Sequence, residues 1–331
     1  METRASKEAG QEEGPAEQTP ETERSNTMTR SIGPVPGLVL FSMLGVLIRI
    51  YTTRLFAYKD APTYALIWPQ ILGCLIMGAL TRSRHTLSPS LYTGLTTGLC
   101  GSITTFSSWQ LLVYTQFFNT DKGEHSKFNN FLGGVSVLVT TMTCALGALR
   151  AGFGAGDMVC AGRRCNTNKW TCKCDYTVAV VCVLGVMAAC VVVGKAHDTR
   201  SVSIGVLLGP AGTLVRWKLS KLNTRHGTAR SLPIGTLVAN IAGCAVLATV
   251  HTLQSGGIVR PSHTSCQVLA SISDGFCGCI TTISTFAYEL HTLSPRQSTT
   301  YTIVSIVTTQ CLFILICGIY FETAHVDYPI C

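Results

Sequence analysis

Apolar segments separated by short polar stretches follow one another along most of this chain. A helix that crosses a bilayer needs roughly 17 to 25 mostly apolar residues. We expect nine such helices, near residues 35–56, 64–81, 91–117, 130–150, 176–194, 202–219, 233–253, 267–291 and 300–321. The second carries Pro69, and Gly209, Pro210 and Gly212 interrupt the sixth. Neighbouring helices satisfy such backbone breaks inside a membrane, so the pattern predicts an all-α membrane protein.

Composition agrees with a polytopic membrane protein. The 331 residues are 47% hydrophobic and 13% charged, whereas soluble domains carry about 25% charged residues. The net charge of +8 does not indicate nucleic-acid binding, because no basic and aromatic pattern or binding motif accompanies it. Residues 1–33 contain seven glutamates and few large apolar side chains, which predicts a disordered tail and not a cleaved signal peptide.

Lys and Arg residues are distributed unequally between alternate loops. Residues 1–33 and the loops on the same side together carry more than twice as many as the loops on the other side. Because cytoplasmic loops are enriched in Lys and Arg, we expect the N-terminus in the cytoplasm and the C-terminus outside. We expect a multi-pass protein of the plasma membrane.

The chain contains an internal repeat. The segment TGLCGSITTFSSW at 97–109 returns as DGFCGCITTISTF at 274–286, GVLIR at 45–49 as GTLVR at 212–216, and QILGC at 70–74 as NIAGC at 240–244. These matches keep their order, which predicts two four-helix repeats, 34–152 and 196–322. A Cys-rich loop (153–175), a linker helix (176–195) and a C-terminal tail (323–331) complete the division. One extra helix inverts the second repeat, and inverted repeats place transport sites near the bilayer midplane.

The alternative is a duplicated structural bundle without transport. Small residues at helix contacts would then explain Gly45, Gly73, Gly212 and Gly243. They do not explain the hydroxyl groups of the repeated segment, which need partners inside lipid.

The two long repeats resemble the G-x-x-G-x-x-T-T-F-S-T-F motif of the Fluc family of fluoride channels, and the fused halves resemble its eukaryotic fluoride exporter branch. The resemblance implies a fluoride-selective channel that confers fluoride resistance, with fluoride as its partner and one chain of two fused halves as the working unit. It also implies a third helix that is broken in each repeat, and a central structural Na⁺. The implied sodium ligands are the carbonyl groups of Gly101, Thr104, Gly278 and Thr281.

The resemblance also implies pore residues. One set is complete: Phe106, Phe286, Asn240, Tyr301 and Ser305, with the hydroxyls of Thr105, Ser107, Thr282 and Ser284. The other set departs from the family pattern at Gln70, Trp109, Ile283 and Leu132, and keeps Ser136. We therefore expect one working pore and one vestigial pore. The sequence does not tell which pore contains Asn240.

Several residues remain to be interpreted. Arg49 and Arg216 are either vestibule charges that attract anions or structural residues that extend to the interface, and we favour the second interpretation. Glu289 is expected to be satisfied or interfacial. Four cysteines cluster in the loop, but their spacing is unlike that of paired zinc ligands; they are Cys160, Cys165, Cys172 and Cys174.

No catalytic motif is present, so an enzyme is not expected. Two alternatives to the channel stay open. One is a less selective or proton-coupled anion transporter, for which no second carboxylate is visible beside Glu289. The other is a membrane protein that does not transport.

Overall fold

The computed structural model describes residues 33–119, 126–160, 171–195, 200–225, 232–255 and 262–324. Within these ranges the chain is helical and forms no strand, which confirms the prediction of an all-α protein. The predicted acidic tail lies outside the described residues except for Gly33, and so does most of the predicted C-terminal tail.

The first half contains two continuous helices, then a broken one, then a long one. Its elements are α1 (Val35–Phe56), α2 (Ile67–Arg82), η1 (Arg84–Thr86), α3 (Pro89–Thr93), η2 (Gly94–Cys100), α4 (Gly101–Ile103), α5 (Phe106–Phe118) and α6 (Lys127–Cys160). The start of α3 follows directly from its sequence. Ser88 accepts a hydrogen bond from the backbone of Leu91, and Pro89 occupies the first helical position, where its missing N–H costs nothing.

The second half repeats this order. After α7 (Thr171–Lys195) come α8 (Arg200–Ser220), α9 (Leu222–Arg225), α10 (Ile234–Gln254), α11 (His263–Ser271), η4 (Ile272–Cys277), α12 (Gly278–Ile280), α13 (Ser284–Thr292), α14 (Pro295–Phe313), η5 (Ile314–Gly318) and α15 (Ile319–Ala324). Ser262 caps α11 in the same way that Ser88 caps α3.

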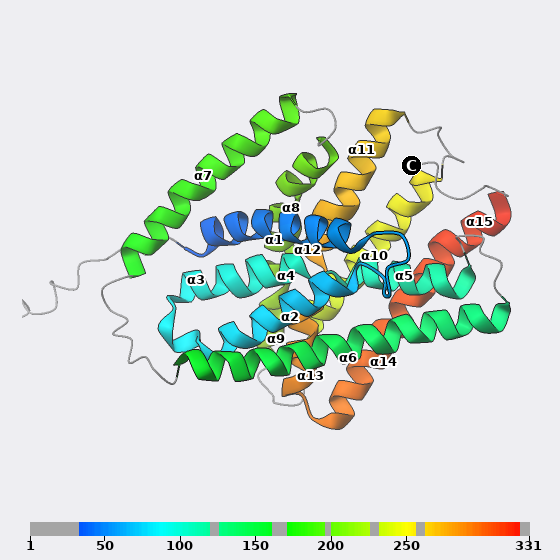
Figure 1. Cartoon of the computed structure of the whole chain (residues 1–331), viewed down its shortest axis with the longest axis horizontal. Helices are drawn as coiled ribbons and strands as arrows, with labels where there is room; N and C mark the ends of the chain where they lie inside the picture. The colour runs from blue at the N-terminus through cyan, green and yellow to red at the C-terminus, as the bar shows by residue number, and fades with distance from the viewer. Residues whose placement is uncertain are drawn as a thin grey trace, which may run out of the picture. The chain divides into compact units, whose positions relative to one another are not determined.

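The helix α6 continues ten residues beyond its predicted end. It lies beside α2 (Figure 1), and its last turns fit closely against that helix. A Cβ atom at Gly152 would lie 2.1 Å from the carbonyl oxygen of Leu75, and one at Gly156 would lie 2.7 Å from that of Ala79. The predicted Cys-rich loop is therefore shorter than expected. Cys160, Cys172 and Cys174 lie in helices, and Cys165 lies outside the described residues.

Five helices in the described part of the chain are long and apolar enough to cross a bilayer. They cover Val35–Phe56, Lys127–Val159, Ile234–Gln254, His263–Thr292 and Pro295–Thr323. Of the other predicted spans, α2 has 16 residues and the segment from α3 to α5 is interrupted. The fold is therefore that of a helical membrane protein.

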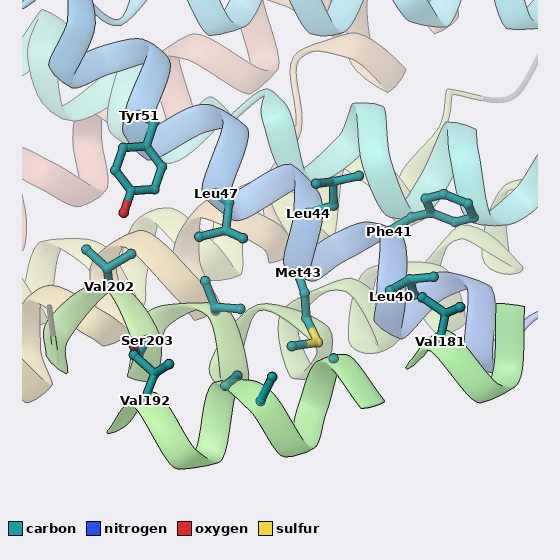
Figure 2. Close-up of a pocket in the computed structure, with 14 residues that line it drawn as sticks. Leu40, Phe41, Met43, Leu44, Leu47, Tyr51, Val181, Val192, Val202 and Ser203 are labelled. Carbon is teal, nitrogen blue, oxygen red and sulfur yellow. The ribbon is translucent and has the colours of Figure 1, made fainter. Parts of the chain in front are cut away.

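The helix α7 lies at the edge of the helices, against α1 and α8 (Figure 1). Between these three helices runs an apolar groove of about 520 Å³. Figure 2 shows Met43 and Leu47 of α1, Val192 of α7 and Val202 of α8 around it. None of the predicted pore residues lines this groove, so the site described next lies elsewhere.

Candidate functional site at the two broken helices

Both copies of the repeated segment break a helix at the same place. Thr104 has an extended backbone, with φ −91° and ψ 149°. Thr281, its counterpart, has φ −99° and ψ 155°. New helices begin at Phe106 and Ser284. Inside a membrane, non-helical backbone is tolerated only where protein surrounds it or where it lines a cavity. The residues at both breaks are buried in the protein.

The two breaks cross and cap each other. The hydroxyl oxygen of Thr281 accepts hydrogen bonds from the backbone N–H groups of Phe106 (3.2 Å) and Ser107 (3.1 Å). In the equivalent arrangement, the hydroxyl oxygen of Thr104 accepts from Ile283 (3.3 Å) and Ser284 (3.0 Å). Each threonine thus satisfies the free N–H groups at the start of a helix in the other half.

Further hydroxyl groups complete this crossing. Thr105 Oγ1 lies 3.2 Å from Thr281 Oγ1, and Ser107 Oγ lies 3.0 Å from the same atom. Thr104 Oγ1 lies 3.2 Å from Thr282 Oγ1. The structure therefore brings together six threonine and serine residues of the two repeated segments: Thr104, Thr105, Ser107, Thr281, Thr282 and Ser284.

A side-chain amide holds each break from its own half. Gln70 donates to the carbonyl oxygen of Thr105 (2.8 Å) and accepts from its N–H (3.2 Å). Asn240 makes the same two contacts with Thr282, at 3.4 and 3.0 Å. The sequence departure from Asn to Gln therefore leaves this hydrogen-bond pattern intact, and Gln70 is not a damaged copy of Asn240 in this respect.

Arg49 and Arg216 reach the breaks from α1 and α8. Arg49 donates from Nη1 to the carbonyl oxygens of Ser102 (2.7 Å) and Gly278 (2.8 Å), and from Nη2 to that of Asp274. Arg216 donates from Nε to the carbonyl oxygen of Cys279 (2.8 Å) and from Nη2 to the carbonyl oxygen of Thr97 (2.8 Å).

The two arginines are 4% and 3% exposed. The interpretation that they extend to the membrane interface is therefore wrong, because both guanidinium groups are engaged inside the protein. Each arginine bonds to carbonyl oxygens in both halves and so joins them.

Glycines allow α1 and α2 to approach the first break, and α8 and α10 to approach the second. A Cβ atom at Gly45 would lie 2.8 Å from the carbonyl oxygen of Leu99, and one at Gly212 would lie 2.4 Å from that of Phe276. Gly73 and Gly243 face the methyl groups of Thr104 and Thr281 in the same way. These four glycines therefore have the close-packing role that the alternative of a structural bundle attributed to them.

A group of aromatic rings lies next to the two breaks. The ring centroids of Phe106 and Phe286 lie 5.4 Å apart, edge to face, and Phe286 lies 5.0 Å from Tyr301. Trp109 packs 5.3 Å from Phe106 and donates its indole N–H to the carbonyl oxygen of Val137. Phe106, Phe286 and Tyr301, which were predicted to share a pore, are neighbours.

The predicted pore residues of α6 do not fit the structure. Leu132 is 47% exposed, and Ser136 is also exposed. The buried face of α6 instead carries Val137 and Thr141, spaced four residues apart like Tyr301 and Ser305 of α14. Thr141 pairs with Tyr64 at 2.6 Å between their hydroxyl oxygens.

A buried carboxylate lies beside the second half of the site. Glu289 accepts hydrogen bonds from Thr236 (2.5 Å), Tyr301 (2.9 Å) and Asn223 (3.1 Å). It is therefore satisfied, as expected. The sequence did not indicate Thr236 or Asn223, because neither lies in a repeated motif.

Comparisons with known proteins agree with the repeat. A family model described as "CrcB-like protein, Camphor Resistance (CrcB)" matches residues 37–154 and again residues 202–319. No solved structure matches this chain.

Named relatives come from fungi and bacteria. Fluoride export protein 1 of Schizosaccharomyces pombe is 30% identical over 297 residues, which cover 84% of this chain and 93% of the relative. Fluoride export protein 1 of Candida albicans is 28% identical over 86% of this chain and 78% of the relative. Fluoride-specific ion channel FluC 2 of Staphylococcus saprophyticus is 33% identical over 109 residues, which cover 33% of this chain and 84% of the relative. The two matches to the family model together cover more than half of this chain. The chain therefore belongs to the CrcB family, with two copies of the family domain in one polypeptide.

Proposed function

We propose that this protein is a channel that exports fluoride across the plasma membrane and protects the cell from its toxicity. The observation that carries the proposal is the contact of Phe106, Phe286 and Tyr301 beside two crossed helix breaks. Relatives named as fluoride export proteins cover most of the chain. A membrane potential that is negative inside drives an anion outward.

The chemistry of the site suits a small anion. Aromatic ring edges carry partial positive charge, and hydroxyl groups of Ser and Thr can replace the hydration shell of an ion. A fixed charge in a narrow pore would hold fluoride too tightly, because conduction requires release. Arg49 and Arg216 already donate to backbone carbonyls, which supports a pore that acts through neutral donors.

One of two pores is the working one in this proposal. Phe106, Phe286 and Tyr301 are in contact, and Ser305 lies one turn beyond Tyr301 on α14. On the vestigial side, Ile283 replaces a phenylalanine, and the Trp109 indole is tied to α6. Asn240 and Gln70 hold the two breaks alike, so neither amide distinguishes the pores.

A structural sodium ion at the crossing is part of the proposal. Its ligands would be the carbonyl oxygens of Gly101, Thr104, Gly278 and Thr281, which are neutral oxygens at helix breaks, the kind of group that coordinates Na⁺ in membrane proteins. Gly278 also accepts from Arg49, and a carbonyl oxygen has two lone pairs, so this donor set fits. Thermal unfolding in sodium and in N-methylglucamine tests it: equal melting temperatures would contradict the ion.

The topology belongs to the proposal as well. Nine helices, with the second half inverted, place the N-terminus in the cytoplasm and let one chain form the channel. The repeated order of elements and the paired contacts at the two breaks support this arrangement.

A proton-coupled transporter is the second candidate, and buried Glu289 is the observation that favours it. Glu289 would then have to exchange a proton during transport. Fluoride flux that depends on an imposed pH gradient, and that loses this dependence in Glu289→Gln, would support coupling. Flux that is indifferent to the gradient would support the channel.

The deciding experiment is fluoride efflux from liposomes that contain the purified protein, with chloride as the comparison anion. We expect rapid fluoride efflux and negligible chloride leak. Phe106→Ile should reduce the flux strongly, and a variant that still exports fluoride at the native rate would refute the assigned pore. Absence of flux from folded protein would favour a structural membrane protein without transport.

A further inference from the structure

The side chain of Gln110 is buried at an unusual place. It lies one turn after Phe106 on α5, so both residues share one helix face, and it is 0% exposed. Its carbonyl oxygen Oε1 accepts from Gln310 Nε2 (2.9 Å) and from the hydroxyl of Thr309 (3.2 Å), both on α14.

The orientation of the Gln110 amide is fixed by its neighbour. Gln310 Nε2 also donates to the backbone carbonyl oxygen of Gln110, at 2.9 Å. The nitrogen of Gln310 must therefore face Gln110, and Gln110 must present its oxygen in return. The Nε2 atom of Gln110 is then left with no hydrogen-bond partner among the residues the structure describes.

Ser305 on α14 is likewise buried with a polar atom that lacks a partner. It is 1% exposed, and its Oγ atom also has no hydrogen-bond partner in the described part of the chain. The two groups belong to one interface, because Thr309 Oγ1 lies 3.2 Å from Gln110 Oε1 and 2.7 Å from the carbonyl oxygen of Ser305. Buried polar groups without partners are rare and costly, so two of them at one interface indicate a place where a polar ligand binds.

Gln110 and Ser305 each lie one helical turn after an aromatic residue of the Phe106–Phe286–Tyr301 group. Tyr301 precedes Ser305 by one turn on α14, and Phe106 precedes Gln110 by one turn on α5, while Phe286 touches both aromatic residues. One turn beyond Gln110, Tyr114 packs against Phe313 of α14 at 5.8 Å. The two helices therefore run alongside each other over these turns.

We propose that the amide nitrogen of Gln110, together with the Ser305 hydroxyl, binds fluoride one helical turn beyond the Phe106 contact. Both groups can donate, and a small anion accepts only, whereas a water molecule also needs acceptors for its own hydrogens. The proposal rests on the proposed function. It assigns a donor from the first half to a pore whose Tyr301 and Ser305 come from the second.

The repeat makes this donor asymmetric. The position equivalent to Gln110 in the second half is Ala287, which has no polar side chain. The second pore therefore lacks this donor, which gives the inequality of the two pores a cause beyond the aromatic residues.

The test compares fluoride efflux from liposomes for the unaltered protein, Gln110→Met and Thr53→Val. Methionine keeps the length of glutamine but has no N–H group, and we expect efflux to fall about tenfold or more, the loss of one hydrogen bond to an ion. Thr53 on α1 also has a buried oxygen without a partner in the described residues. Its variant should conduct like the unaltered protein.

Stability separates conduction from folding. Gln110→Met also removes the Oε1 acceptor of Gln310 and Thr309, so this variant should melt below the unaltered protein. Ser305→Ala removes only a hydroxyl that has no partner in the described residues, so it should melt at or above the original temperature and still lose efflux. Equal efflux for Gln110→Met and the unaltered protein would overturn the inference and leave the proposed function standing.

A binding measurement covers the case in which even the unaltered protein shows no flux, which would contradict the proposed function. Fluoride should raise the melting temperature of the unaltered protein and not that of Gln110→Met. Equal shifts in the two proteins, or no shift in either, would overturn the inference.

Discussion

At the scale of single residues, the two buried arginines show how the protein uses buried charge to hold the backbone at the two helix breaks. Burial of a guanidinium group is costly unless hydrogen bonds satisfy it. Arg49 meets this condition with the carbonyl oxygens of Ser102, Gly278 and Asp274. The carbonyls of Ser102 and Gly278 lie at the breaks, where the backbone N–H groups four residues later bond to Thr281 and Asn240 instead. The buried charge therefore uses carbonyl oxygens that the broken helices leave free.

This arrangement predicts that Arg49→Lys is destabilised although it keeps the charge. A lysine ammonium is a compact point charge and cannot reproduce the planar fork of arginine. We expect a loss of about 2 kcal/mol in the free energy of unfolding, the scale of a hydrogen bond to a charged group, measured by thermal or denaturant unfolding in detergent.

The control for this prediction is Arg54→Lys. Arg54 is exposed on the same helix and should change stability by no more than about 0.5 kcal/mol. If Arg49→Lys is as stable as Arg54→Lys, the charge alone matters, and a vestibule role for Arg49 becomes the better explanation.

At the scale of helices, close packing of α1 and α8 onto the breaks depends on glycine. A methyl group at Gly212 would collide with the carbonyl oxygen of Phe276, which belongs to the backbone and cannot rotate away. We expect Gly212→Ala to lower the melting temperature, since overpacking costs roughly 1–3 kcal/mol, and to reduce fluoride flux because the break shifts.

The matched control is Gly147→Ala on α6. A Cβ atom there meets nothing within 4 Å, and alanine favours a helix over glycine by roughly 1 kcal/mol. This variant should melt at or above the original temperature with unchanged flux. A destabilised Gly147→Ala together with a neutral Gly212→Ala would contradict the packing described for α8.

The sequence predicted the broken helices well and the register of the fourth helix poorly. The repeated segment is long, so its two copies align without ambiguity, and the hydroxyl contacts of Thr104 and Thr281 follow from it. By contrast, Ser136 was matched to Ser305 through a single residue. The buried face of α6 is set by residues spaced four apart, which are Val137, Thr141, Ala145 and Leu149.

Three-dimensional contacts explain the rest of what the sequence missed. Asn223 lies 66 residues from Glu289 in the sequence and still donates to it at 3.1 Å. The partnerless nitrogen of Gln110 depends on which way Gln310 faces. Neither relation leaves a pattern in one sequence, because each joins residues whose spacing only the fold determines.

At the scale of the whole molecule, the proposed inversion means that equivalent loops of the two halves lie on opposite sides of the membrane. Lys59 lies between α1 and α2, and Lys221 lies between α8 and α10 in the equivalent position; both are exposed. A short epitope inserted after Lys59 should be reached by antibody in intact cells. The same epitope after Lys221 should be reached only after the membrane is permeabilised.

Fluoride resistance of each tagged protein in cells serves as the control that the insertion leaves the fold intact. If both epitopes are reached from the same side, the halves are parallel, and the crossed capping by Thr104 and Thr281 would have to form without inversion. If they are reached from opposite sides, one chain supplies both orientations. The Phe106 and Phe286 rings then come from oppositely directed halves, so a single pore needs both halves of the same polypeptide.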